Sequence, residues 1–420
     1  MSTTIEKAAK IFGRLSEKED LSQMFTRLQP HFADAPFVLP KNEYNAENYE
    51  ARKQVLINAT NTQLAHLSAY KNHPDLDKLP GSIENFIGFT QVPTGIAGPL
   101  RVNGSEAKGD FFIPLATTEG ALVASYHRGA KATLLSGGIT SVCVAEGVRR
   151  SPLFGFANLE SGIRFLMWIT RVKSEFEGIV TAHSKHCNLN DVLLNLEGNN
   201  VILTFEYLTG DASGQNMVTI CTDAICKYLI EHSPIKTNYW YVEGNYSGDK
   251  KASAISFTTV RGKKVTAECV VKKAALEDIL KTTAKAVAQY WTASTVSVIQ
   301  TGSIGAQGHF ANGITALFMA TGQDVACVSE AAVGVTRMEV YNEEDLYVSV
   351  TLPNLIVGTI GGGTKFSTQQ ECLALMDCIG AGKTRKFAEI CGALLLCGEL
   401  SIAAALAEGH FTSAHQNLGR

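Results

Sequence analysis

The sequence predicts an α+β protein in which a helical N-terminal region precedes a large α/β domain, with a small α+β domain inserted into the large one. Three observations support this prediction. Apolar residues recur at helix-like spacing before about residue 85, and Gly-rich apolar segments follow them. Similar Gly-rich apolar segments recur after residue 253, following a stretch of alternating helix and strand patterns, as expected for an inserted domain. At 420 residues the chain is long enough for two or three domains.

The N-terminal region, residues 1–87, is predicted to be helical. Ile11, Leu15, Met24 and Leu28 recur at the spacing that places side chains on one face of a helix. Three prolines then interrupt the pattern before residue 41. We therefore expect a helical arm that ends in a proline-broken stretch.

The large domain is predicted in two parts, residues 88–150 and 253–420. In the first part, Thr117–Leu135 has the small and apolar residues of a helix that packs deep in a core. In the second part, a strand over Val265–Val271 is expected to lead into a helix over Ala274–Tyr290.

The inserted domain is predicted over residues 151–241. Helical patterns at Gly162–Lys173 and Ala212–His232 flank strand-like runs at Val192–Leu196 and Val201–Tyr207. The asparagine-rich turn between the two runs is typical of a β-hairpin. This segment therefore reads as a small α+β unit.

The composition indicates a soluble globular protein of the cytoplasm. Hydrophobic residues make up 45% of the chain, charged residues 18%, and the net charge of −3 gives no basic surface for nucleic acid or membrane. The apolar run Cys391–Ala407 is interrupted by Gly398 and Glu399, which favours a buried core helix over a membrane span. Met1–Asp20 lacks the apolar region of a signal peptide. The ten cysteines show no C-x-x-C pair or zinc spacing, so we expect reduced thiols and no metal site.

Two segments in the first two-thirds of the chain carry candidate catalytic groups. Glu119 has apolar neighbours, and a desolvated carboxylate can carry a proton near neutral pH. Its alternative role is structural, as a helix N-terminal carboxylate bonded to backbone amides. Asp249, Lys250 and Lys251 follow a glycine-rich segment, where a lysine can be aimed at a developing oxyanion. A solvated turn is the alternative for this triplet.

Three further signals lie towards the C-terminus. Asp324 follows an apolar helical segment, Gly313–Ala320, and is either functional or part of a helix C-terminal turn. The glycine-rich loop Gly358–Thr364 could bring backbone amides close to a phosphate or thioester, although a tight structural turn explains it equally well. It does not match the G-x-G-x-x-G pattern of the Rossmann fold. His415 is either an idle terminal residue or a mobile acid that closes over a site.

The joint occurrence and order of these signals resolve the alternatives. The segments that carry the likeness are ENFIG (Glu84–Gly88), VPTGIAGPL (Val92–Leu100), TTEGALVAS (Thr117–Ser125), GDASGQNM (Gly210–Met217), GDKKA (Gly248–Ala252), TGQD (Thr321–Asp324), NEEDLYVS (Asn342–Ser349), GTIGGGT (Gly358–Thr364) and GEL (Gly398–Leu400). With them the chain resembles the soluble, eukaryote-type catalytic portion of the 3-hydroxy-3-methylglutaryl-CoA (HMG-CoA) reductase family. The resemblance implies a large CoA-substrate domain, a ferredoxin-like inserted domain that binds nicotinamide, and a catalytic-lysine loop at residues 242–252.

The resemblance also implies a role for each candidate catalytic residue. Glu119 would donate a proton to the carbonyl oxygen, and Lys250 would stabilise the oxyanion of the hemithioacetal. Asp324 would tune both through a shared hydrogen-bond network. His415 would protonate the departing CoA thiolate, and Asn312 would contact the substrate oxygen and the lysine.

Two substrate-binding positions depart from the family pattern. Ala293 stands where the family normally has a lysine that pairs with the free carboxylate of the substrate, and Glu243 stands where it has a serine. Both changes oppose binding of a negatively charged acyl end. Arg150, Asp249 and Lys251 remain as substrate-binding residues.

The cofactor expected from the resemblance is NADPH. Ser213 and Gln215 replace two methionines of the cofactor motif, and Val328 replaces an asparagine. The positions that match are Ser184 and Lys185, in place of a Ser–Arg pair at the 2′-phosphate, together with Asp211, Asn216, Gly358 and Gly361.

Three functions are compatible with these residues. The first is an NADPH-dependent four-electron reductase of HMG-CoA or a related acyl-CoA. The second is a repurposed homologue that performs non-redox chemistry in specialised metabolism. The third is a silent partner in mixed oligomers. In the family the lysine loop comes from a neighbouring subunit, so we expect a homodimer or tetramer with a shared active site and no nucleic-acid or membrane partner.

Overall fold

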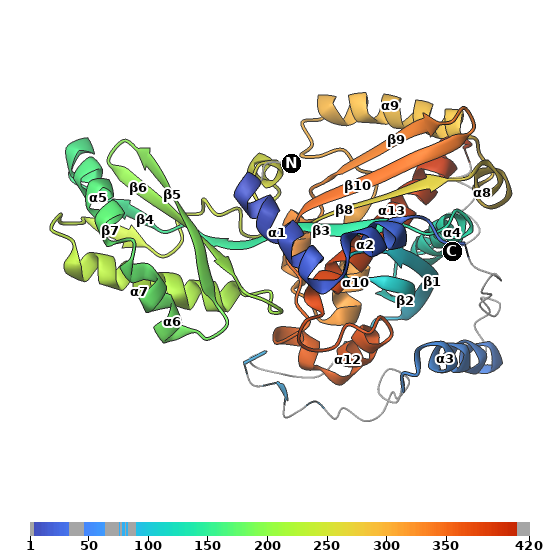
Figure 1. Cartoon of the computed structure of the whole chain (residues 1–420), viewed down its shortest axis with the longest axis horizontal. Coiled ribbons are helices and arrows are strands. Elements are labelled where there is room, and N and C mark those ends of the chain that lie inside the picture. Colours follow the sequence, from blue (N-terminus) through green and yellow to red (C-terminus); the bar gives the residue numbers. More distant parts are fainter. Residues whose placement is uncertain are drawn as a thin grey trace.

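The computed structural model has two lobes of unequal size that are joined by one long strand (Figure 1). Helices and strands alternate in both lobes, which confirms the predicted α+β class. The structure describes residues 4–32, 46–63, 75, 78–79, 81–82 and 90–409.

The joining strand is β3 (Thr140–Arg150), which takes part in both lobes. Its first part pairs antiparallel with β8 (Gly262–Val271) in the larger lobe, and its last residues pair with β6 (Asn200–Leu208) in the smaller one. The sheet order is β7-β4-β6-β3-β8-β10-β9, with β5 paired to β6. The remaining bounds are β4 Leu153–Gly155, β5 Asn188–Glu197, β7 Tyr239–Tyr241, β9 Val335–Tyr341 and β10 Asp345–Leu355.

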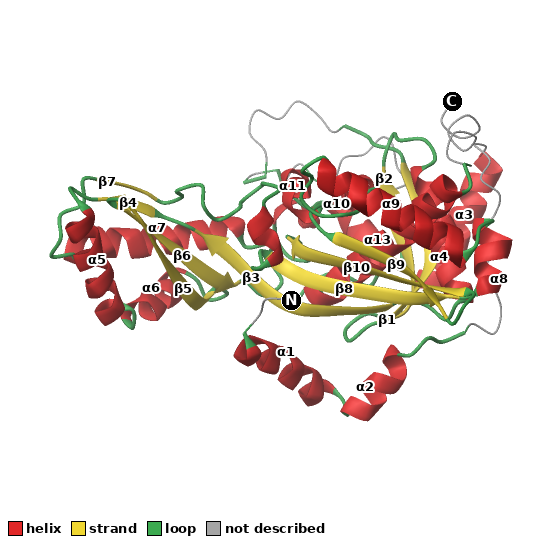
Figure 2. Cartoon of the chain, turned by 90° about the horizontal axis from the view of Figure 1, so that it is seen from above, coloured by secondary structure: helices red, strands yellow, loops and turns green. Residues whose placement is uncertain are grey.

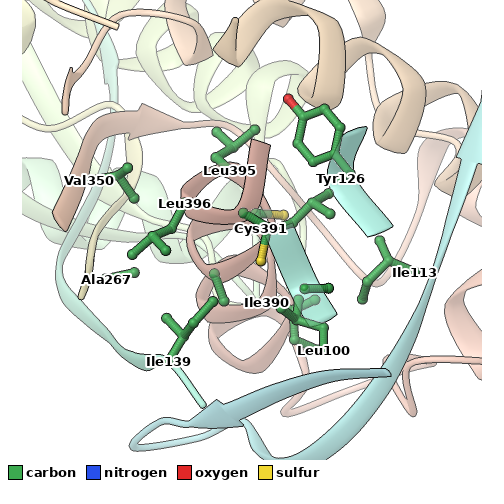
Figure 3. Packing of buried hydrophobic residues seen from close by; sticks show 14 of the residues in the cluster. Leu100, Ile113, Tyr126, Ile139, Ala267, Val350, Ile390, Cys391, Leu395 and Leu396 are labelled. Carbon is green, nitrogen blue, oxygen red and sulfur yellow. The ribbon is translucent and has the colours of Figure 1, made fainter. Parts of the chain in front are cut away.

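One helix, α13 (Thr384–Ala407), runs through the core of the larger lobe (Figure 3). It is long and apolar enough to cross a membrane, but 83% of its apolar window is buried inside the protein. This confirms the core helix predicted over Cys391–Ala407. Its buried Glu399 accepts hydrogen bonds of 2.7 Å from the backbone N–H groups of Gly308 and His309, which compensate for the burial of a carboxylate.

A β-hairpin and a second helix pack beside α13. The hairpin joins β1 (Thr94–Asn103) to β2 (Lys108–Ala116), and α4 (Leu122–Leu135) packs against both β1 and α13. The backbones of α4 and α13 touch at Gly129, where a Cβ atom would overlap the carbonyl group of Cys397. This contact requires a glycine.

The helix predicted over Thr117–Leu135 begins later, at Leu122. Ala121 has a left-handed backbone with a φ of 67°, which an α-helix cannot include. Glu119 therefore lies before the helix rather than in its first turn, and its N–H donates to Oγ1 of Thr117 over 3.0 Å.

The helix predicted over Ala274–Tyr290 is also wrong in its extent. A short α8 (Lys273–Ala275) continues into a π-helical turn, Leu276–Leu280. Lys281 then takes a left-handed φ of 57°, which ends the turn. A separate helix, α9 (Ala284–Gln300), follows.

Three helices complete the larger lobe and lead to the candidate site. The first, α10 (Phe310–Thr321), confirms the apolar helix predicted over Gly313–Ala320. It ends at Gly322, whose φ of 70° is the usual glycine termination of a helix. The others are α11 (Val328–Ala331) and α12 (Ser367–Ala374).

The smaller lobe packs its helices on a sheet of β7, β4, β6, β5 and the end of β3, around a hydrophobic core of its own. Strands β5 and β6 are joined by a two-residue turn in which Gly198 has a φ of 57°, as the asparagine-rich sequence predicts. The helices are α5 Leu159–Val172, α6 Glu175–His183 and α7 Gln215–His232. Helices α5 and α7 confirm the two helical patterns predicted from the sequence.

The N-terminal region forms the predicted helices, α1 (Ile5–Lys18) and α2 (Leu21–Leu28), followed by α3 (Ala46–Thr60). Figure 2 shows α1 and α2 on one side of β3. Ion pairs join α1 to both lobes: Lys7 lies 2.6 Å from Glu206 of β6, and Arg14 lies 2.7 Å from Glu146 of β3.

Candidate functional site

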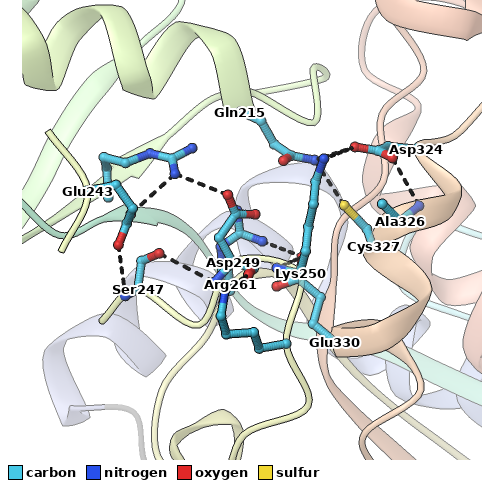
Figure 4. A network of polar contacts seen from close by, with 12 residues as sticks. Gln215, Glu243, Ser247, Asp249, Lys250, Arg261, Asp324, Ala326, Cys327 and Glu330 are labelled. Atoms are coloured by element: carbon cyan, nitrogen blue, oxygen red, sulfur yellow. Dashed lines mark hydrogen bonds and ion pairs between the residues drawn. The ribbon is translucent and has the colours of Figure 1, made fainter. Parts of the chain in front are cut away.

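The loop that follows β7 brings the candidate lysine against the candidate aspartate (Figure 4). Nζ of Lys250 lies 2.9 Å from Oδ2 of Asp324. The hydrogen bond that Lys250 donates to Asp324 raises the pKa of Lys250. Burial opposes ionisation of Asp324, but bonds from Lys250 and from the N–H of Ala326 lower the pKa of this carboxyl. Lysine and aspartate therefore both stay charged near neutral pH.

Asp324 also has a structural role. Its Oδ1 accepts the N–H of Ala326 over 3.0 Å and so caps the turn Val325–Cys327. From the smaller lobe, Nε2 of Gln215 lies 2.9 Å from Sγ of Cys327 and 3.4 Å from Oδ2 of Asp324. The first residue of α7 thus touches the candidate site, a contact that the sequence pattern does not reveal.

Arg150 is shared between two carboxylates. Its Nη1 lies 3.2 Å from Oε2 of Glu243 and 3.1 Å from Oδ2 of Asp249. Glu243 further accepts the backbone N–H groups of Ser151, at 3.3 Å, and Tyr246, at 3.1 Å. The structure thus brings these three sequence-nominated residues together, and Glu243 holds the start of the lysine loop.

Asp249 has a second cationic partner, Arg261, whose Nη2 lies 2.7 Å from Oδ1. Arg261 also forms an ion pair with Glu330 through Nη1, and the two side chains are only 2% and 0% exposed. Burial raises the pKa of Glu330, although Arg261 opposes the shift. Sequence reasoning did not select either residue. The sequence does contain one indication of Glu330, because a glutamate within a run of small and apolar residues needs a buried partner.

A second polar pair joins Glu119 and Asn312. Nδ2 of Asn312 lies 2.9 Å from each carboxylate oxygen of Glu119. The expectation that Glu119 is desolvated is wrong for the single chain, because Glu119 itself is exposed to solvent. Glu119 comes from the segment before α4, and Asn312 comes from the first turn of α10.

These two pairs lie at opposite ends of α10. Asn312 is in its first turn, while Asp324 follows its C-terminal glycine. The helical residues between Asn312 and Thr321 alone span about 14 Å. A single chain therefore does not bring Glu119 next to Lys250. His415 and the segment Glu84–Gly88 lie outside the described residues.

Two other nominated substrate residues are exposed. Nζ of Lys251 donates to the backbone carbonyl of Asp249 over 3.0 Å and has no carboxylate partner among residues 90–409. Ala293 lies on the exposed face of α9, outside the network around Lys250.

The nominated cofactor residues gather where the two lobes meet. Asp211 accepts the backbone N–H groups of Thr359 and Ile360 on its carbonyl oxygen, at 2.9 and 3.2 Å. Gly358 packs against the same loop so closely that a Cβ would lie 2.7 Å from the backbone nitrogen of Ser213. Burial opposes ionisation of Asp211, yet backbone N–H groups lower the pKa of its carboxyl.

The remaining nominated cofactor positions come from both lobes. Asn216 is exposed in the first turn of α7, and Gly361 is exposed in the glycine loop. Ser184 and Lys185 follow α6 and precede β5, whose Asn188 pairs with Leu208 near the Asp211 loop.

Comparisons with known proteins agree with this architecture. The family model of hydroxymethylglutaryl-coenzyme A reductase matches residues 48–420. The 3-hydroxy-3-methylglutaryl-coenzyme A reductase of Pyrococcus abyssi is 41% identical over 88% of this chain and 92% of its own. That of Methanocaldococcus jannaschii is 39% identical, over 92% and 96%.

Solved structures share the fold. A class II 3-hydroxy-3-methylglutaryl-CoA reductase from Streptococcus pneumoniae, solved with NADPH in open conformations, superposes with a TM-score of 0.68 at 19% identity, over 85% of this chain and 86% of that one. With a family model across most of its length and relatives near 40% identity, this chain belongs to the HMG-CoA reductase family.

Proposed function

We propose that this chain is an NADPH-dependent HMG-CoA reductase, which reduces the thioester of HMG-CoA to the primary alcohol of mevalonate and releases coenzyme A. The observation that carries the proposal is the ammonium group of Lys250, held 2.9 Å from Asp324. A thioester carbonyl accepts hydride only where the charge that grows on its oxygen is stabilised, and a fixed cation does this. The names of the relatives support the choice of HMG-CoA.

Each nominated residue has a chemical task in this reaction. Lys250 stabilises the oxyanion, and Asp324 keeps the amine protonated and aimed. Asn312 orients Glu119 by donating to its carboxylate, at 2.9 Å, and Glu119 supplies a proton to the carbonyl oxygen. His415 gives a proton to the departing thiolate, since an imidazole titrates near neutral pH.

NADPH, when bound, supplies the hydrides, one from each of two cofactor molecules per product. The junction of the lobes fits this group. The N-cap of α7 is Gly214, which provides no side-chain cap, so the backbone N–H groups of the first turn can donate hydrogen bonds to a phosphate. The open glycines 361 and 362 face solvent with positive φ values. Lys185 supplies a positive charge suited to a 2′-phosphate.

The acyl end is recognised mainly by Lys251 in this proposal. Arg150 is already shared by Glu243 and Asp249, so its charge is largely compensated within the chain. Lys251 retains an exposed ammonium next to the catalytic lysine. A cation at this position compensates for Ala293 in binding the free carboxylate of the substrate.

The active site is shared between two copies of the chain, in a homodimer or a larger assembly. The length of α10 supports this arrangement, because it separates Glu119 from Lys250 in one chain. We assign residues 88–150 and 253–420 to CoA-substrate binding, 151–241 to nicotinamide binding and 242–252 to the lysine loop. The ten buried, free cysteines support a reducing cytoplasmic location.

The test is NADPH consumption, followed by absorbance, with purified protein and HMG-CoA, while free thiol is measured in parallel. Two NADPH consumed for each CoA released establishes the reductase. Lys250→Ala should lower kcat by at least about a thousandfold, because the oxyanion loses its cation. Lys273→Ala is the matched control, since Lys273 is similarly exposed and forms an ion pair with the surface residue Glu344. NADPH and thiol signals that both stay flat with a folded protein would reject the proposal.

A further inference from the structure

The loop that carries the catalytic lysine has an unfavourable backbone. Asn245, Gly248 and Lys250 all have positive φ values, of 62°, 78° and 54°. For a residue with a Cβ atom this left-handed conformation is unfavourable, because Cβ lies too close to the following carbonyl oxygen. Lys250 therefore keeps it only if surrounding contacts hold its main chain.

Two side chains outside the loop, Glu330 and Arg261, bind Asp249 and Lys250 within it. The backbone N–H of Lys250 donates to Oε1 of Glu330 over 3.4 Å. Arg261 bonds to the same Glu330 oxygen and, over 2.7 Å, to Oδ1 of Asp249. One buried ion pair thus fixes the side chain before the lysine and the main chain of the lysine itself.

The anchors come from well-packed parts of the larger lobe. Glu330 is on α11, and Arg261 directly precedes β8, the central partner of β3 and β10. The segment from Asp324 to Glu330 therefore holds the lysine at both ends, through Nζ at Asp324 and through the main chain at Glu330.

The Arg261–Glu330 ion pair has features that limit its contribution to the free energy of folding. Nε of Arg261 and Oε2 of Glu330 are buried and have no hydrogen-bond partner among the described residues. A buried pair with unsatisfied atoms adds little net stability compared with apolar residues of the same size. Its contacts to residues 249 and 250 are what it contributes specifically.

We propose that the Arg261–Glu330 ion pair positions the catalytic lysine: it holds Asp249 and the main chain of Lys250 so that Nζ reaches Asp324 and the substrate oxygen. Neither residue contacts the reacting atoms, so both are positioning residues. The inference deepens the proposed reductase and rests on it only for the catalytic role of Lys250. The placement of the loop is a separate, measurable property.

Glu330→Asp tests the proposal most sharply. Aspartate keeps the charge beside Arg261, but its carboxylate is one methylene shorter and withdraws from the N–H of Lys250. We expect kcat to fall about tenfold or more, because small displacements of a catalytic group are costly. KM values for HMG-CoA and NADPH should change less than about twofold, which a general loss of structure would not produce. Glu339→Asp, at an exposed carboxylate paired with Arg337, should leave kcat unchanged.

A second readout does not depend on activity. Trypsin cleaves after lysine, and peptide mass spectrometry measures cutting after Lys250 and Lys251 in the folded protein. A released loop should be cut several times faster in Glu330→Asp than in wild type or Glu339→Asp. Arg261→Lys, which keeps the charge but loses the forked contact to Asp249, should show the same two effects and serves if Glu330→Asp does not fold.

The outcomes separate this inference from the proposed function. Wild-type kcat and wild-type cleavage in either folded variant would overturn the positioning role. A wild-type protein without turnover would reject the reductase, while the cleavage rates would still decide whether the pair holds the loop.

Discussion

At the scale of single residues, the charge of Lys250 depends on one neighbour. Asp324 accepts a hydrogen bond from Lys250 and raises the pKa of that lysine. A raised pKa means that the amine keeps its proton to a higher pH, so the cation to which we assign oxyanion stabilisation persists into alkaline solution.

Asp324→Asn should therefore change both rate and pH dependence. The amide no longer stabilises the ammonium, so the pKa of Lys250 falls and the alkaline limb of the kcat–pH profile moves to lower pH. We expect kcat at neutral pH to fall roughly a hundredfold, since the ammonium group of the lysine is also no longer held in position by a carboxylate. Steady-state rates from pH 6 to 10 measure both effects. Asp223→Asn, at a surface pair with Lys227, is the control, and an unmoved alkaline limb would contradict the assignment.

The residue types in the sequence are enough to predict Lys250 and Asp324 as site residues, but they do not indicate which residues position them. Their motifs place a lysine on a glycine-rich loop and a carboxylate after an apolar helix, and both signals are local. Arg261 and Glu330 were missed because their role depends on contacts between distant segments. Glu119 and Asn312 were predicted as site residues separately, whereas their hydrogen bond and the solvent exposure of Glu119 depend on packing that local sequence does not encode.

At the scale of elements, the larger lobe depends on a close contact of two helices. The backbones of α4 and α13 meet at Gly129 and Cys397, and α13 supplies more of the buried core residues than any other helix or strand of the described cluster. The small residues in both helices allow this approach. Protein interiors are packed too densely to admit an added methyl group without movement.

Gly129→Ala should destabilise the protein by about 3 kcal/mol, because the added Cβ forces the two helices apart. Gly13→Ala, in α1, provides the contrast: a Cβ there meets nothing within 4 Å, so the change should stabilise the helix by about 0.5–1 kcal/mol. Urea unfolding followed by circular dichroism measures both. Equal midpoints for the two variants would show that the α4–α13 contact is not rigid.

Element types were predictable, whereas some element ends were not. The hydrophobic period locates α5, α7, α10 and α13, since each buries one face or its whole length. The start of α4 and the break before α9 depend on left-handed residues, Ala121 and Lys281, that are not glycines. Sequence patterns do not indicate a left-handed conformation at alanine or lysine, so both helices were predicted too long.

At the scale of the whole molecule, strand β3 and helix α10 have opposite effects on the candidate site. β3 connects the lobes, so the nominated cofactor residues can approach the nominated substrate residues. α10 holds Asn312 and Asp324 apart within one chain. The shared active site that we propose therefore takes Glu119 from one copy of the chain and Lys250 from another, as in a symmetric dimer.

Mixing two inactive variants tests this arrangement directly. Glu119→Gln and Lys250→Ala should each be inactive alone. In a mixed dimer, one site combines both substitutions, while the other takes an intact Glu119 from one chain and an intact Lys250 from its partner. Random exchange makes half of the dimers mixed, so activity should return to about a quarter of the wild-type value. The variants are unfolded and refolded together, and NADPH consumption is compared with that of each variant refolded alone. If both required groups came from one chain, mixed dimers would contain no intact site and activity would stay at the background of the separate variants.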